Sequence, residues 1–301
     1  MEAESGRPTR HDREAGRALL LCGHPKSGTS LLLSLLDGHP DIVALPEETK
    51  YFRAIHGHPE LMTAQALLER TRVGRLSRDR ETARQQGRDF ADVDAARFER
   101  EIERRIADGC APQELLPAVA LAYAAATGRE AGRYWAEKTP LQEHHLDVAL
   151  ELWPDLRAIY VVRDPRDVHV SFQAKRLKRG RRLGVVQSAL RIRASLRAWA
   201  TFQAREPSRC WTVRYEELVR RPEATMRLVA DFLEIDWRPE LLVPTLAGRD
   251  WAGNSMFAEQ HSQISESPIG RHTDGLSAGR SWLLSALLAD EFCRYGWSRE
   301  P

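Results

Sequence analysis

Charged side chains follow each of five short apolar segments that the sequence predicts as β-strands. They are Lys26, the pair Glu47–Glu48, Lys138, Arg163 and the pair Arg214–Tyr215. Because ligands of open α/β sheets bind at the carboxyl ends of the strands, these side chains are expected to converge on one crevice. Each of them alone has a structural interpretation. Together, the lysines, the arginine and the carboxylate pair favour a site for an anionic nucleotide.

The segment Gly23–Ser30 predicts a phosphate-binding loop. The apolar run 18–22 precedes it, and a leucine-rich helix follows it, which Thr29 or Ser30 could cap. N–H groups at the start of a helix, next to a glycine loop and at the positive end of the helix dipole, bind phosphate. A glycine turn without a ligand is the alternative interpretation of this segment by itself.

This loop does not have the sequence of a magnesium–triphosphate site. A Walker A loop reads G-x-x-x-x-G-K-[ST], but Thr29 stands at the lysine position and Lys26 lies inside the loop. A Walker B acid is also missing, since the strand 158–162 ends in Arg163. The pattern predicts a phosphate site and no metal site.

A second phosphate site is predicted after Arg163. Asp164 and Pro165 are typical of a helix start, and Ser171 and Lys175 share one face of the helix that follows. The alternative is a serine and a lysine on a solvated face. Two separate phosphate sites favour a nucleotide phosphorylated at both its 5′ and its 3′ position.

The elements that carry these residues predict an α/β fold. Helical patterns alternate with strands, which indicates a P-loop-type three-layer sandwich, with a central parallel sheet of about five strands and helices on both faces. The predicted strands are 18–22, 42–45, 134–138, 156–162 and 210–214. Further helices are predicted at 188–205, 216–221, 223–233 and 281–295, with a loop-like segment over 239–278.

The domain organisation predicted is a flexible N-terminal arm, 1–17, and a single domain, 18–301. The stretch 59–130 interrupts the alternation and is interpreted as a helical insertion. Its predicted helices are 60–73, 93–107 and 112–127, joined by a polar connection at 74–92.

Composition limits the class of protein. The 301 residues are 42% hydrophobic and 29% charged, as in a soluble globular protein, and the net charge of +2 does not by itself favour nucleic acid. No apolar run is long enough to span a membrane, and the polar stretch 1–17 has no apolar h-region, so no secretory leader is expected. The cysteines at 22, 110, 210 and 293 lack metal-ligand spacing and are interpreted as buried, reduced thiols. A cytoplasmic enzyme is expected.

Two motifs resemble the sulfotransferases that use 3′-phosphoadenosine 5′-phosphosulfate (PAPS). Pro25–Ser30 resembles their 5′-phosphosulfate loop, and Val162–Ser171 resembles their 3′-phosphate motif. The pattern is closest to the protein-tyrosine sulfotransferase branch and its bacterial relatives, over residues 18–55 and 134–300. The segments similar to that branch are 39–41, 47–49, 137–140 and 214–218.

The resemblance implies the residues that bind PAPS. Those for the 5′-phosphosulfate are Pro25, Lys26, Ser27, Gly28, Thr29 and Ser30. Those for the 3′-phosphate are Arg163, Ser171 and Lys175, with Gly270 and Arg271 in a segment that closes over it. Tyr215 is expected near the nucleotide. Lys26 stands where the tyrosine branch usually has arginine, so that the charge is kept and the planar fork is lost.

The resemblance also implies catalytic roles. Glu48 is expected to be the general base, and one additional residue before the glutamates leaves Glu47 as the alternative. Lys138 and Ser262 are expected to stabilise the transferring sulfuryl group. Lys26 is expected to offset the charge that develops on the bridging oxygen as it leaves. PAPS is the expected cosubstrate and adenosine 3′,5′-bisphosphate (PAP) the product, with no metal. The alternative bases are His24, His39, His144 and His145, interpreted instead as turn or helix-surface residues.

The acceptor is left open by the sequence. A tyrosyl or other phenol, a glycan and a small natural-product hydroxyl all fit, with acceptor choice expected in the insertion. No nucleic acid or membrane span is expected, and a homodimer is one open alternative. Two other functions compete: a small-molecule kinase with a degenerate P-loop, and a non-catalytic nucleotide-binding protein.

Overall fold

The computed structural model describes residues 14–52, 93–107, 111–178, 180–251, 253 and 263–299. Several sequence-based expectations concern the remaining positions. The arm before residue 14, the helix and connection expected between residues 59 and 92, Cys110 and Ser262 all lie outside the described residues.

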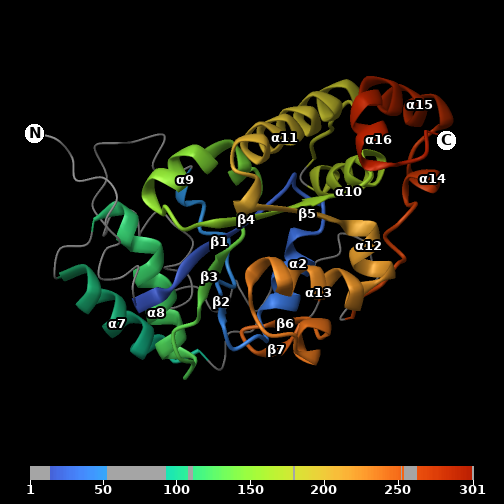
Figure 1. Cartoon of the computed structure of the whole chain (residues 1–301). Coiled ribbons are helices and arrows are strands. Elements are labelled where there is room, and N and C mark those ends of the chain that lie inside the picture. Colours follow the sequence, from blue (N-terminus) through green and yellow to red (C-terminus); the bar gives the residue numbers. More distant parts are fainter. Residues whose placement is uncertain are drawn as a thin grey trace, which may run out of the picture.

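The central sheet has five parallel strands (Figure 1). They are β1 (Arg17–Cys22), β2 (Ile42–Ala44), β3 (Tyr134–Glu137), β4 (Arg157–Val162) and β5 (Cys210–Arg214). Their order is β2-β3-β1-β4-β5, and every neighbouring pair is parallel. The predicted parallel sheet is therefore confirmed, with β1 at its centre. The loop that follows β1 consequently lies between the ends of β3 and β4.

Both faces of the sheet are buried, which explains why its strands are continuously apolar. Side chains alternate between faces along a strand. Leu20 and Cys22 of β1 pack into one core cluster, whereas Leu19 and Leu21 pack into the other. Helices cover both faces, so the predicted three-layer arrangement is also confirmed (Figure 1).

The helices divide between these two faces. The face of Leu19 and Leu21 is covered by α2 (Thr29–Leu36), α12 (Tyr215–Arg220) and α13 (Pro222–Leu233). The other face packs against α7 (Ala95–Ala107), α8 (Leu115–Ala126), α9 (Leu146–Leu152), α10 (Pro165–Leu177), α11 (Val185–Arg205), α15 (Ala278–Leu287) and α16 (Ala289–Tyr295). Short 3₁₀ turns are η3 (Pro112–Glu114), η4 (Gln142–His145), η5 (Pro207–Arg209) and η6 (Pro239–Leu242). Helices α7 and α8 lie within two of the predicted helical segments.

Capping was predicted correctly at one helix and wrongly at two others. Helix α10 has Pro165 in its first turn, and the Asp164 carboxylate accepts a hydrogen bond from the Arg166 N–H at 2.8 Å. Helix α2 is capped by Gly28, with no side-chain cap, so Thr29 and Ser30 are helical residues. The sequence after the strand 134–138 also predicts Thr139 as a cap with Pro140 at the first helical position. These residues do not start a helix, because the Thr139 hydroxyl donates to the buried Glu137 carboxylate at 2.6 Å instead.

The C-terminal third differs from the expected loop and single helix. The segment 239–278 contains a hairpin of β6 (Thr245–Leu246) and β7 (Arg249–Asp250), as well as α14 (His272–Gly275). Asp37 anchors the hairpin by accepting hydrogen bonds from the Thr245 hydroxyl at 2.8 Å and the Gly248 N–H at 2.9 Å. The expected helix 281–295 is interrupted at Leu288, whose backbone leaves the helical region (φ −117°, ψ 32°).

The described cysteines correct one further expectation. Cys22 and Cys210 are buried and free, as expected, but Cys293 is exposed, because α16 presents it to solvent. Among the described residues, none of the helices has the length and apolar character needed to cross a membrane.

Candidate active site

A buried carboxyl group holds the start of the glycine loop between β1 and α2. Glu143 accepts a hydrogen bond from the Gly23 N–H at 3.1 Å and another from the Ser195 hydroxyl. Burial raises the pKa of Glu143 to about 7, against the lowering effect of these donors. Glu143 was not predicted from the sequence, because its partners lie 120 and 52 residues away.

The loop needs glycine where it joins the helix. Gly28 has φ 112°, and a Cβ there would lie only 2.4 Å from Cδ2 of Tyr215. The Tyr215 ring therefore lies directly on the loop backbone at the start of α2, beside the N–H groups that the first turn of a helix leaves without helical partners. The contact brings a flat aromatic side chain next to backbone N–H groups of the kind that bind anions.

Lys26 lies at the centre of a cluster of charges. Burial lowers its pKa to about 8, and the nearby cations Lys175, Lys138 and Arg163 lower it further, while the Glu48 carboxylate opposes the shift. Lys26, Lys138 and Arg163 follow three different strands, and Lys175 belongs to α10. The structure therefore brings the other three cations close enough to repel Lys26. A bound anion would reduce that repulsion.

The carboxylate expected as a base is paired with one of these cations. The Lys138 ammonium donates a hydrogen bond to Glu48 Oε1 at 3.1 Å, and Glu48 is the more exposed of the two side chains. Glu47 is buried, with only 6% of its surface exposed. Of the two adjacent glutamates, Glu48 is thus the one that pairs with Lys138 and is partly exposed to solvent.

Glu137 ties the Glu48 segment to the end of β3. Its Oε1 accepts hydrogen bonds from the Thr49 N–H at 3.0 Å, the Thr49 hydroxyl at 2.8 Å and the Thr139 hydroxyl. The Lys50 N–H in turn donates to the Thr139 hydroxyl at 3.1 Å. Burial raises the pKa of Glu137, although these donors and Lys138 oppose the shift. Glu137 thereby holds residues 49 and 50 beside the strand that carries Lys138.

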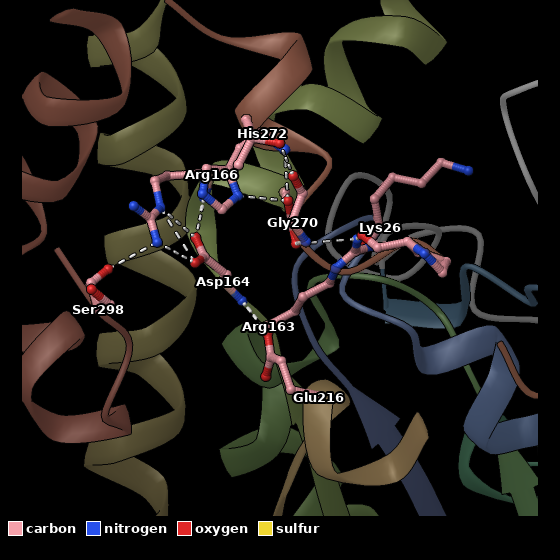
Figure 2. Close-up of polar contacts among 11 residues, drawn as sticks. Lys26, Arg163, Asp164, Arg166, Glu216, Gly270, His272 and Ser298 are labelled. Carbon is pink, nitrogen blue, oxygen red and sulfur yellow. Dashed lines mark hydrogen bonds and ion pairs between the residues drawn. The ribbon is translucent and has the colours of Figure 1, made fainter. Parts of the chain in front are cut away.

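Arg163 lies between the glycine loop and a turn near the C-terminus (Figure 2). Its Nη1 donates to the Lys26 carbonyl at 3.3 Å, and its Nη2 donates to the Pro268 carbonyl. The guanidinium carbon also lies 4.5 Å from the centre of the Tyr215 ring. Arg163 therefore contacts both the Lys26 backbone and the Tyr215 ring, which the sequence places far apart.

The turn that contacts Arg163 carries Gly270 and Arg271. Gly270 has φ 75°, and its N–H donates to Asp167 at 2.9 Å. Arg271 lies close enough to Tyr215 to oppose the rise that burial causes in the pKa of the Tyr215 phenol. Both residues expected to close over a 3′-phosphate thus lie beside Arg163 and Tyr215.

The remaining expected site residues, Ser171, Lys175 and Ser262, are connected to this cluster by fewer observations. Ser171 is buried on α10, and within the described part of the chain no hydrogen bond joins it to Arg163. Lys175 lies on the same helix, one turn further along, within electrostatic range of Lys26. Ser262 lies outside the described residues, so its role stays a prediction.

The histidines considered as alternative bases have other environments. His24 lies in the loop, where burial lowers its pKa to about 4, and its Nδ1 is 3.0 Å from the Pro25 carbonyl. His39 bridges the Asp236 carbonyl and the Asp41 N–H. His145 stacks on Phe52, with ring centres 5.4 Å apart. Among the described residues, no group of three or more metal-binding side chains forms a metal site.

Two buried donors at this edge fit an anionic ligand. The Arg163 side chain is 6% exposed, and its Nε has no hydrogen-bond partner among the described residues. The Ser27 hydroxyl is likewise buried in the loop without a described partner. Since buried donors are normally satisfied, phosphate oxygens are a fitting acceptor for both.

Comparison with known proteins gives a consistent result. A model described as "Sulfotransferase family" matches residues 18–239. Protein-tyrosine sulfotransferase 1 from Danio rerio is 26% identical over 226 residues, which are 74% of this chain and 55% of that protein. The chain therefore spans about half the length of this curated relative.

Two solved sulfotransferase domains share the fold. The domain from the curacin biosynthetic pathway superimposes with a TM-score of 0.57 at 17% identity, covering 91% of this chain and 98% of that one. The domain from the Synechococcus PCC 7002 olefin synthase gives 0.58 at 20% identity, covering 95% and 98%. At these identities, the likeness concerns the arrangement of the sheet and its helices.

Proposed function

This chain belongs to the Sulfotransferase family, and we propose that it transfers a sulfuryl group from PAPS to a hydroxyl group of an acceptor. The observation that carries the proposal is the charge cluster around Lys26. Lys26, Lys138, Lys175 and Arg163 converge there, together with the carboxylate of Glu48. Such a site favours a ligand with several negative charges and still contains one group able to accept a proton.

The nucleotide would be bound at two places. The loop 25–30 and the start of α2 would hold the 5′-phosphosulfate through N–H groups and the Lys26 ammonium. Arg163, with Ser171, Lys175 and the turn of Gly270 and Arg271, would hold the 3′-phosphate. Tyr215, which lies against Gly28 and the Arg163 guanidinium, would offer a flat surface to the nucleotide.

PAPS would supply an activated sulfuryl group, so the protein's contribution would be mainly orientation and charge stabilisation. Lys26 would stabilise the charge that develops on the departing phosphate oxygen. Lys138 would stabilise the sulfuryl oxygens. Glu48 would accept the proton of the acceptor hydroxyl, and its hydrogen bond to Lys138 keeps it in a defined orientation.

Three classes of acceptor remain candidates: a tyrosyl or other phenol, a glycan hydroxyl and a small natural-product hydroxyl. We propose that the region 59–130 contributes to the choice among them. The competing kinase activity lacks support, because the loop has no lysine after Gly28 and β4 is followed by Arg163 where a Walker B acid would stand.

The test is a sulfuryl-transfer assay. The purified protein is incubated with ³⁵S-labelled PAPS and a panel of phenols, tyrosyl peptides, glycans and hydroxylated small molecules, with and without EDTA. We expect a labelled product with at least one acceptor class and no inhibition by EDTA. Phosphate transfer from Mg²⁺–ATP to the same acceptors, without sulfuryl transfer, would contradict the proposal.

A further inference from the structure

Asp167 on α10 holds a distant turn through three hydrogen bonds. It is 1% exposed, and it accepts from the Gly270 N–H, the His272 N–H and His272 Nδ1, each at 2.9 Å. The carboxylate as acceptor requires that the imidazole proton be on Nδ1. The pKa of Asp167 is lowered, because the His272 hydrogen bond, Arg163 and the two backbone donors together outweigh the burial that would raise it.

The same turn is also bound by Arg163. The Arg163 Nη2 donates to the Pro268 carbonyl and lies 3.7 Å from Asp167 Oδ2. Arg163 and Asp167 are four residues apart. Arg163 binds the Pro268 carbonyl of the turn, and Asp167 binds the N–H groups of Gly270 and His272. Figure 2 shows His272 and Gly270 on the α10 side of Arg163, with Lys26 on the opposite side.

We propose that Asp167 and His272 are positioning residues that set the turn 268–272 against Arg163, and thereby complete the 3′-phosphate site. The inference rests on the proposed function. Both carboxylate oxygens of Asp167 accept hydrogen bonds from the turn, so Asp167 would act through Gly270 and His272. Without Asp167, the carboxylate that holds Gly270 and Arg271 in place relative to the Arg163 guanidinium would be lost.

A purely structural role would have a different consequence. If Asp167 only stabilised the fold, its substitution would lower the affinity for every nucleotide to a similar extent. A positioning role at the 3′-phosphate affects ligands that carry this group and leaves those without it nearly unchanged. PAP and AMP differ in the 3′-phosphate alone and therefore separate the two roles.

The experiment measures PAP and AMP affinity by isothermal titration calorimetry for the wild type and four variants. Asp167→Asn removes the charge and two acceptor lone pairs. His272→Phe keeps the ring and removes the Nδ1 donor, whereas His272→Asn retains an N–H donor at that place. Glu266→Gln is the matched control, since its exposed ion pair with Arg220 lies on the same segment but away from Asp167.

We expect Asp167→Asn and His272→Phe to raise the Kd for PAP about tenfold or more, with the Kd for AMP changed less than about twofold. His272→Asn should recover most of the affinity, and Glu266→Gln should resemble the wild type. In the transfer assay, the KM for PAPS should rise while kcat is kept. Melting temperatures check that each variant is folded.

Two results would overturn the inference. One is unchanged PAP affinity in both Asp167→Asn and His272→Phe, and the other is an equal loss for PAP and AMP. A wild-type protein that fails to prefer PAP over AMP would instead refute the proposed function, and the inference with it. If Asp167→Asn does not fold, the comparison of His272→Phe with His272→Asn decides.

Discussion

The Lys138 ammonium lies 3.1 Å from Glu48 Oε1, which joins a residue after β3 to a residue after β2. This contact, together with the greater exposure of Glu48, favours Glu48 over the buried Glu47 as the candidate base. The residue proposed to accept the proton, Glu48, is therefore hydrogen-bonded to Lys138, the cation proposed to act on the sulfuryl oxygens.

Glu48→Gln should lower kcat by about a hundredfold to ten-thousandfold, because the amide cannot accept the acceptor's proton. PAP affinity should change little, since Glu48 is not among the groups proposed to bind phosphate. Steady-state kinetics and calorimetry measure the two effects. The matched control is Glu47→Gln, and an inactive Glu47 variant beside an active Glu48 variant would reassign the base by one position.

Lys26 should make PAP binding depend on pH. Its pKa is lowered to about 8, mainly by burial and then by the cations around it, and PAP binding favours its charged form. Above about pH 7, where the phosphates of PAP are ionised, affinity should therefore be nearly constant up to that pKa and fall as the pH rises above it, by at most about tenfold per pH unit.

Lys26→Arg is the control for this pH profile, because arginine stays charged across the range. The variant should bind PAP with little change in affinity between about pH 7 and pH 10. Calorimetric titration of both proteins at a series of pH values provides the measurement. An equally steep fall in the arginine variant would show that another group controls binding.

Arg163→Ala should remove most of the preference for PAP over AMP, a loss of about tenfold to a hundredfold. Arg163→Lys should not restore it. A lysine cannot donate to the Lys26 and Pro268 carbonyls at once while it faces the Tyr215 ring, as the guanidinium does. Competition binding with the two nucleotides tests this, and full recovery by lysine would show that charge alone is sufficient.

Gly28→Ala should weaken nucleotide binding and destabilise the protein by about 1–2 kcal/mol or more. The added Cβ meets the Tyr215 ring at 2.4 Å, in a backbone conformation with φ 112°. Gly128→Ala is the control, since Gly128 also has a positive φ (69°) but nothing within 4 Å of its added Cβ. Chemical denaturation and PAP titration should show that only Gly28→Ala affects both quantities. A binding loss of equal size at Gly128 would contradict the argument.

The features that the sequence determined are those encoded by neighbouring residues. The apolar run before Gly23, the glycine loop and the capping pair Asp164–Pro165 each specify a local backbone path. They predict the parallel sheet and the loop at its edge, because strands and helix starts depend on residues a few positions apart. The chemistry at the strand ends followed from this topology.

Only the tertiary structure decided which partners these residues have. Asp167 meets His272 105 residues later, Glu137 meets Thr49 88 residues earlier, and Glu143 meets Gly23 120 residues earlier. Such pairs have no sequence spacing that identifies them. The lowered pKa of Lys26 likewise depends on burial and on cations from other elements, so it exists only once the chain has folded.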